Sequence, residues 1–237
     1  MKAAVALCLL FALCTFEPSN ATTSLVVLRA EIAKLKVVTT KLIGEMKILH
    51  HQLYSTVNLK LGNIRIKANT EISTIINPVL RNIEQAATKA GNNALPCYER
   101  AKRSLNELKE ESSYQLDYCT QNALSSLEPL EANIADAIGV GNKALTYLNS
   151  IFPSCFSISI FETEKCVREK MPVAEESVAN LRKAVAAAKD TEAVNTEVII
   201  EEARTCSQKP VGRVAQSVGK VREKAFDCIQ KAEKNQN

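Results

Sequence analysis

Tryptophan is absent from this 237-residue sequence, and aromatic residues make up only 5% of it. Seven glycines and seven prolines are too few to supply the frequent turns of a protein built from short β-strands. Alanine, valine, leucine, isoleucine, lysine and glutamate dominate instead, a composition typical of long helices. The sequence therefore predicts an all-α fold.

Histidine is scarce as well, since the neighbours His50 and His51 are the only two. No cysteine pair has the close spacing of a zinc site, and the segment GVGNKAL at 139–145 lacks the glycine spacing of a phosphate-binding loop. Adjacent carboxylates such as Glu110 and Glu111 point in different directions on a helix. We therefore expect no enzyme activity, no bound metal and no cofactor.

Charge of one sign is not concentrated anywhere in the chain. The 30 lysines and arginines are mixed with 26 aspartates and glutamates, which leaves a net charge of +4. Such mixing is typical of solvated helix faces and not of a nucleic-acid-binding patch. We therefore expect no nucleic-acid partner.

The N-terminus has the layout of a secretory signal peptide. Lys2 precedes an apolar run over residues 3–16, and the small residues Ser19 and Ala21 follow a short polar stretch. The run is shorter than the roughly 20 apolar residues that cross a bilayer, and no later segment of that length is free of charges. We predict a signal peptide at residues 1–21, a secreted extracellular protein and no membrane span.

Six cysteines remain after that segment, and an even number in an exported chain predicts three disulfides. They are Cys97, Cys119, Cys155, Cys166, Cys206 and Cys228.

Two pairs of these cysteines share a spacing of 22 residues, Cys97 to Cys119 and Cys206 to Cys228. On a helix this spacing corresponds to about 33 Å, so Cys97 and Cys119 should not bond to each other if the segment between them is helical. A bond between Cys206 and Cys228 is less strictly excluded, because a turn at Pro210 would shorten the distance. Two helices stapled side by side would pair Cys97 with Cys228 and Cys119 with Cys206 if antiparallel. If parallel, they would pair Cys97 with Cys206 and Cys119 with Cys228. We prefer the antiparallel set, with Cys155–Cys166 closing a local loop around FSISIF.

Apolar residues repeat at alternating steps of three and four along the first half of the chain, which predicts a heptad seam. The seam comprises Leu25, Leu28, Ile32, Leu35, Thr39, Leu42, Met46, Leu49 and Leu53. This seam is a candidate surface for self-association. Residues 22–94 are interpreted as one long amphipathic helical segment, which Pro78 should kink or end and the turn signal GNN at 91–93 should close.

Residues 95–237 are interpreted as a second, six-cysteine helical domain. Pro172 fits the first turn of a helix, and Pro210 should end it. We thus predict an elongated antiparallel helical bundle of long amphipathic helices stapled by three disulfides.

Residues 97–228 resemble the TsetseEP domain of insect secreted proteins. The resemblance is carried by the opening CYERA of the first 22-residue cysteine pair, by the middle cluster CFSISIFETEKC and by the closing FDC. It implies an insect extracellular protein of a body fluid or the gut lumen, and it implies no catalytic residues because the family has no established activity. We expect a secreted, non-enzymatic interaction or structural protein, and the alternative is a carrier of a small lipophilic ligand.

Overall fold

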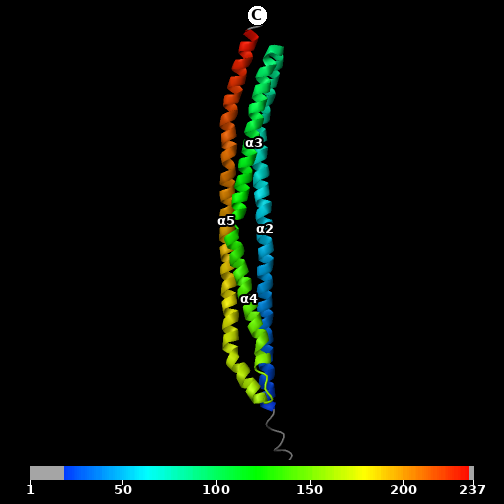
Figure 1. Cartoon of the computed structure of the whole chain (residues 1–237), viewed down its shortest axis with the longest axis vertical. Helices are drawn as coiled ribbons and strands as arrows, with labels where there is room; N and C mark the ends of the chain where they lie inside the picture. The colour runs from blue at the N-terminus through cyan, green and yellow to red at the C-terminus, as the bar shows by residue number, and fades with distance from the viewer. Residues whose placement is uncertain (1–18, 235–237) are drawn as a thin grey trace, which may run out of the picture. The chain divides into compact units, whose positions relative to one another are not determined.

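The protein is all-α in the computed structural model, which describes residues 19–234. Four long helices follow one another, α2 (Ser19–Ala90), α3 (Leu95–Ser125), α4 (Glu128–Ser154) and α5 (Ile160–Lys234) (Figure 1). A short 3₁₀ helix, η1 (Asn92–Ala94), links α2 to α3, and no strand occurs within 19–234. The all-α prediction is confirmed, whereas most of the predicted signal peptide lies outside the described residues.

The chain divides into two compact units that each combine distant parts of the sequence. Unit 1 contains the described residues up to His51 together with Leu130–Thr191, and unit 2 contains Gln52–Pro129 together with the described residues from Glu192 onward. Each unit therefore holds a part of α2, a part of α5 and one shorter helix, α4 in unit 1 and α3 in unit 2. The predicted division of the chain into an N-terminal helical segment, residues 22–94, and a six-cysteine domain, residues 95–237, stays a prediction.

The core of unit 1 joins all three of its helices. Leu28 and Ile32 of α2 pack with Leu148 and Ile151 of α4, and residues 167–178 of α5 complete the cluster. All nine residues of the predicted seam are buried or half-buried, so the three-four spacing identified the inward face of α2 correctly.

Unit 2 has two apolar clusters, and each contains residues from α2, α3 and α5. Ile72 and Leu105 pack with Val214 in one cluster, while Ile83 and Ala101 pack with Ala225 in the other. Burial of these apolar side chains is the main favourable contribution to the stability of this unit.

The turn between α2 and α3 lies at the predicted GNN segment. Gly91 has a φ of 90°, in the left-handed region that glycine adopts without a steric penalty. The backbone N–H of Gly91 donates to the carbonyl oxygen of Thr88, and that of Ala94 donates to the carbonyl oxygen of Gly91. Pro96 stands in the first turn of α3, where no helix hydrogen bond is lost.

The predicted helix start at Pro172 and helix end at Pro210 are wrong, because α5 continues through both. The helix α2 does not end at Pro78 either, so of the two outcomes predicted there only a kink remains. A proline inside a helix removes a backbone hydrogen bond and costs about 3 kcal/mol. Buried residues nevertheless keep their helical spacing on both sides of Pro210, from Ala203 to Val214, and Pro210 is itself buried. Apolar burial along α5 therefore outweighs the local penalty.

Two glycines of α4 provide a matched test of packing in unit 1. A Cβ at Gly141 would lie 2.5 Å from Cγ1 of Ile43, whereas a Cβ at Gly139 would meet no atom within 4 Å. Gly139→Ala should stabilise the protein by about 0.5–1 kcal/mol because alanine has the higher helix propensity. Gly141→Ala should instead lower the free energy of unfolding by about 1 kcal/mol, because overpacking against Ile43 outweighs the gain in helix propensity. Urea unfolding of both variants checks this, and equal stabilisation would contradict the close approach of α2 and α4.

Candidate functional site

The six cysteines form three disulfides, and the pairing is the antiparallel set. Cys97 bonds Cys228 and Cys119 bonds Cys206, each with Cα atoms 5.8 Å apart. The third bond joins Cys155 to Cys166 across the turn between α4 and α5. In unit 2, α3 and α5 are therefore linked twice and run in opposite directions.

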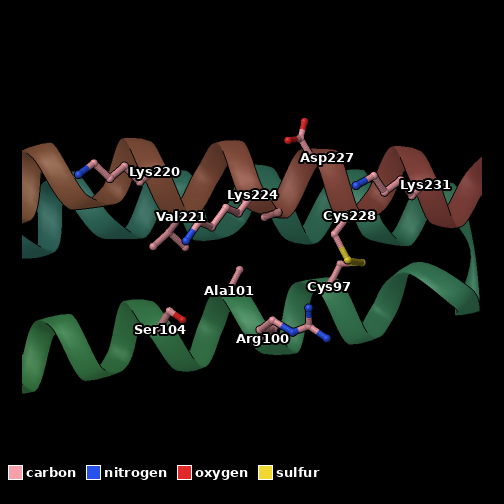
Figure 2. A pocket seen from close by; sticks show the side chains of 11 residues that line it. Cys97, Arg100, Ala101, Ser104, Lys220, Val221, Lys224, Asp227, Cys228 and Lys231 are labelled. Atoms are coloured by element: carbon pink, nitrogen blue, oxygen red, sulfur yellow. A yellow bond between two sulfur atoms is a disulfide. The ribbon is translucent and has the colours of Figure 1, made fainter.

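A groove lies between α3 and α5 beside the Cys97–Cys228 bond, with a volume of about 520 Å³ (Figure 2). Its apolar lining includes Ala101 from α3 and Val221 and Ala225 from α5, together with the disulfide. These small side chains leave the space open, since neither helix contributes a large apolar side chain to the lining. Ser104, which is half-buried, extends the lining along α3.

The polar lining of this groove is mostly cationic. Arg100 of α3 and Lys220, Lys224 and Lys231 of α5 line it, and Asp227 is the one acid among its lining residues. Figure 2 shows the carboxylate of Asp227 on the side of α5 that faces away from α3. All four cations are exposed, and none of them forms an ion pair with a carboxylate of residues 24–234. The groove thus combines an apolar floor with unneutralised positive charge.

The turn closed by Cys155–Cys166 is a second unusual surface, because it presents large apolar side chains to solvent. Phe156 is 85% exposed, Ile158 is fully exposed and Phe161 is 68% exposed. Ile160, the first residue of α5, is also exposed. We call residues 156–161 the apolar tip.

Three hydrogen bonds connect residues within and beside the apolar tip. The hydroxyl of Ser157 donates to Oε2 of Glu162 at 2.5 Å and accepts from the backbone N–H of Ser159 at 3.2 Å. The N–H of Ser157 itself donates to Oγ1 of Thr163 at 3.2 Å. With the disulfide, these bonds reduce the conformational entropy that the tip would lose on binding.

The base of the apolar tip is tied to the start of α2. Glu164 accepts hydrogen bonds from the Ser24 hydroxyl at 2.6 Å and from the Arg168 guanidinium at 2.7 Å. The bond from Ser24, followed by that from Arg168, holds the pKa of the Glu164 carboxyl below its usual value. The carboxylate is therefore kept ionised, which maintains this link between α2 and α5.

The two histidines of the sequence are neighbours on α2. His50 and His51 lie exposed on α2 with ring centroids 6.3 Å apart, and residues 24–234 contain no group of three side chains suited to holding a metal ion. The predicted seam from Leu25 to Leu53 faces the other helices of its own chain. No helix of the described part of the chain is long and apolar enough to span a membrane.

The groove was not predicted, because its two walls are separated by more than a hundred residues and no local motif marks them. The spacing of Lys220, Lys224 and Lys231 along one helix could have suggested a cationic strip, but the apolar floor required knowledge of the pairing of α3 with α5.

The fold and these surfaces define an all-α protein of long packed helices stapled by three disulfides. No protein-family model matches the chain, and no curated protein matches it either.

Proposed function

We propose that this chain is a secreted, non-enzymatic interaction protein that binds its partner through the apolar tip. The observation that carries the proposal is the exposure of Phe156, Ile158 and Phe161 on a turn closed by a disulfide. Exposed apolar surface costs solvation free energy, and large apolar side chains exposed close together in the sequence are typical of an interaction site.

An extracellular location is supported by the three disulfides, which persist in oxidising compartments. The signal-like sequence at residues 1–21 supports it as well. The resemblance of residues 97–228 to the TsetseEP domain points to an insect body fluid or gut lumen as the place of action.

Self-association through the Leu25–Leu53 seam is energetically less favourable than binding through the apolar tip. Leu28, Ile32 and Met46 are already buried among residues of the same chain. A second copy could use that seam only after α2 had left the bundle, which would expose the core of unit 1. The apolar tip requires no such opening.

The proposal is tested by placing a photoreactive benzoylphenylalanine at position 158 or at position 114, where Tyr114 is 76% exposed. In insect haemolymph or gut fluid, we expect the probe at 158 to give one discrete cross-linked product and the probe at 114 to give none. Adding Phe156→Ser should abolish that product, because it removes neighbouring apolar contact area without touching the core.

Equal cross-linking from both positions, or none from 158, would contradict the proposal. The matched control is Tyr114→Ser, which removes an exposed aromatic ring elsewhere and should leave the product from 158 intact. A product of twice the chain's mass from purified protein alone would identify a second copy as the partner.

A second candidate function, a carrier of a small lipophilic ligand, is favoured by the groove between α3 and α5. The volume of about 520 Å³ lies within the range of roughly 300–1,000 Å³ that is usual for ligand sites. This function does not depend on the apolar tip, because the groove belongs to unit 2 and the tip to unit 1.

A further inference from the structure

The groove in unit 2 has two properties that together select a ligand chemistry. Its floor is apolar and is formed by Ala101, Val221, Ala225 and the Cys97–Cys228 bond. From Lys220 to Lys231 the wall on α5 extends for about 16 Å, since a helix rises 1.5 Å per residue. An extended alkyl chain fits such a floor, whereas a compact polar solute would leave it in contact with water.

The charges of the groove select the polar end of the ligand. Arg100 stands on one wall, and Lys224 on the other wall extends toward the gap between α3 and α5 (Figure 2). Because these cations have no carboxylate partner among the described residues, an anionic ligand gains their attraction without first breaking an ion pair. A guanidinium is also suited to bidentate contact with a carboxylate or a phosphate.

We propose that the groove between α3 and α5 binds a single-chain anionic amphiphile, with the alkyl chain along Ala101 and Val221 and the acidic group between Arg100 and Lys224. This inference rests on the carrier alternative above and adds its site and its ligand chemistry. The acidic group can be the carboxylate of a fatty acid or the phosphate of a lysophospholipid, because both match the same cations.

The rigid staple supports this assignment. The Cys97–Cys228 bond fixes the Cα atoms at one end of the groove 5.8 Å apart, so α3 and α5 cannot move apart there and the shape of this end is set. Along the floor, the buried residues Ala101 and Ala225 contribute one methyl group each. The groove is therefore preformed, and a ligand does not have to separate the helices before it binds.

The test uses the disulfide-bonded protein and displacement of a fluorescent fatty acid by defined probes. Oleate and oleoyl lysophosphatidate should each bind saturably at one site. Oleyl alcohol, which has the same chain without the charge, should bind about tenfold more weakly, and octanoate should also bind weakly because it covers less of the floor. Added salt should weaken the anionic probes more than the alcohol.

Three variants separate the two parts of the groove. R100E/K224E should weaken oleate about tenfold and leave oleyl alcohol unchanged, because it reverses the charge on both walls. Ser104→Phe should weaken all long-chain probes, because the ring occupies the floor. Lys209→Glu is the matched control, since it changes an exposed lysine of α5 that does not line the groove, and binding should remain as in the parent protein.

The outcomes distinguish the site from the carrier function. If oleate binds saturably but neither R100E/K224E nor Ser104→Phe weakens it, the site is wrong while the carrier function survives. If no long-chain probe binds, both fail. Equal affinity for oleate and oleyl alcohol would overturn the anionic assignment. Tight binding of a sulfated polysaccharide that depends on Arg100 and Lys224, with no binding of oleate, would reassign the groove to polyanions. Comparison of oleate with the lysophosphatidate identifies the preferred acidic group.

Discussion

Replacing Cys119 and Cys206 together by alanine is expected to lower the free energy of unfolding of unit 2 by about 4 kcal/mol. The bond joins positions 87 residues apart. When Cys97–Cys228 is intact, the Cys119–Cys206 bond still closes a loop that runs 22 residues along α3 and 22 residues along α5. Removing the bond opens this loop and raises the conformational entropy of the unfolded chain. For a protein of this size the change corresponds to a fall in melting temperature of roughly 8–16 °C. Thermal unfolding followed by circular dichroism measures it.

The matched control is C155A/C166A, which removes two cysteines of similar burial from a loop with a sequence separation of only 11. The shorter loop predicts a smaller loss, of about 3 kcal/mol. Limited proteolysis should also locate the two effects, with new cleavage of α3 in the first variant and of the apolar tip in the second. Equal losses in both variants would show that strain or packing, and not loop closure, determines the contribution of the bonds.

Leu61→Ala is expected to destabilise the protein by about 3 kcal/mol. The Leu61 side chain is 1% exposed on the inward face of α2, so its removal leaves a cavity in unit 2 as well as losing buried apolar area. Denaturation with urea gives the change in the free energy of unfolding, and an unchanged m-value would show that only stability had altered.

Leu59 provides the control for that substitution, because it lies two residues away on the same helix and is 68% exposed. Leu59→Ala should change the free energy of unfolding by less than about 0.5 kcal/mol. A loss at Leu59 comparable with that at Leu61 would mean that the outward face of α2 is covered in solution, by a second copy or by another segment.

The helices and the disulfide pairing could be predicted because each depends on a repeated spacing. The three-four pattern from Leu25 to Leu53 defines an apolar face whatever it packs against, and the seam is buried as expected. The equal spacing of the two cysteine pairs reduced the pairing to an antiparallel and a parallel set. The parallel set would require α3 and α5 to run in the same direction, and the bonds of Cys97 and Cys119 show that they do not.

The helix boundaries at Pro172 and Pro210 could not be predicted in the same way. Local propensity penalises both positions, but the outcome depends on how much apolar area the rest of α5 buries. That area is known only once α5 has neighbours: Met171 and Ala174 pack into the core of unit 1, and Val214 packs into that of unit 2. The free energy gained by packing α5 against its neighbours therefore outweighs the local helix penalty of the two prolines.

The two candidate sites could not be predicted from the sequence either, for a different reason. The segment FSISIF was predicted as a loop, yet its exposure depends on whether another element covers it, and Phe156 is open to solvent. To predict the groove, one must know that α3 lies beside α5 and which residues, such as Arg100 and Lys224, line the space between them. Neither is a property of one segment.

The equal spacing of the two staples also has a consequence for oxidative folding. Once either correct bond has formed between antiparallel helices, the other two thiols lie opposite each other at high effective concentration. Between antiparallel helices, a wrong first bond such as Cys97–Cys206 would shift α3 along α5 by about 33 Å, so that Cys119 and Cys228 would no longer lie opposite each other. Thiol–disulfide exchange would then favour return to the correct isomer. The same 22-residue interval that staples the bundle therefore lets the first correct bond align the thiols of the second.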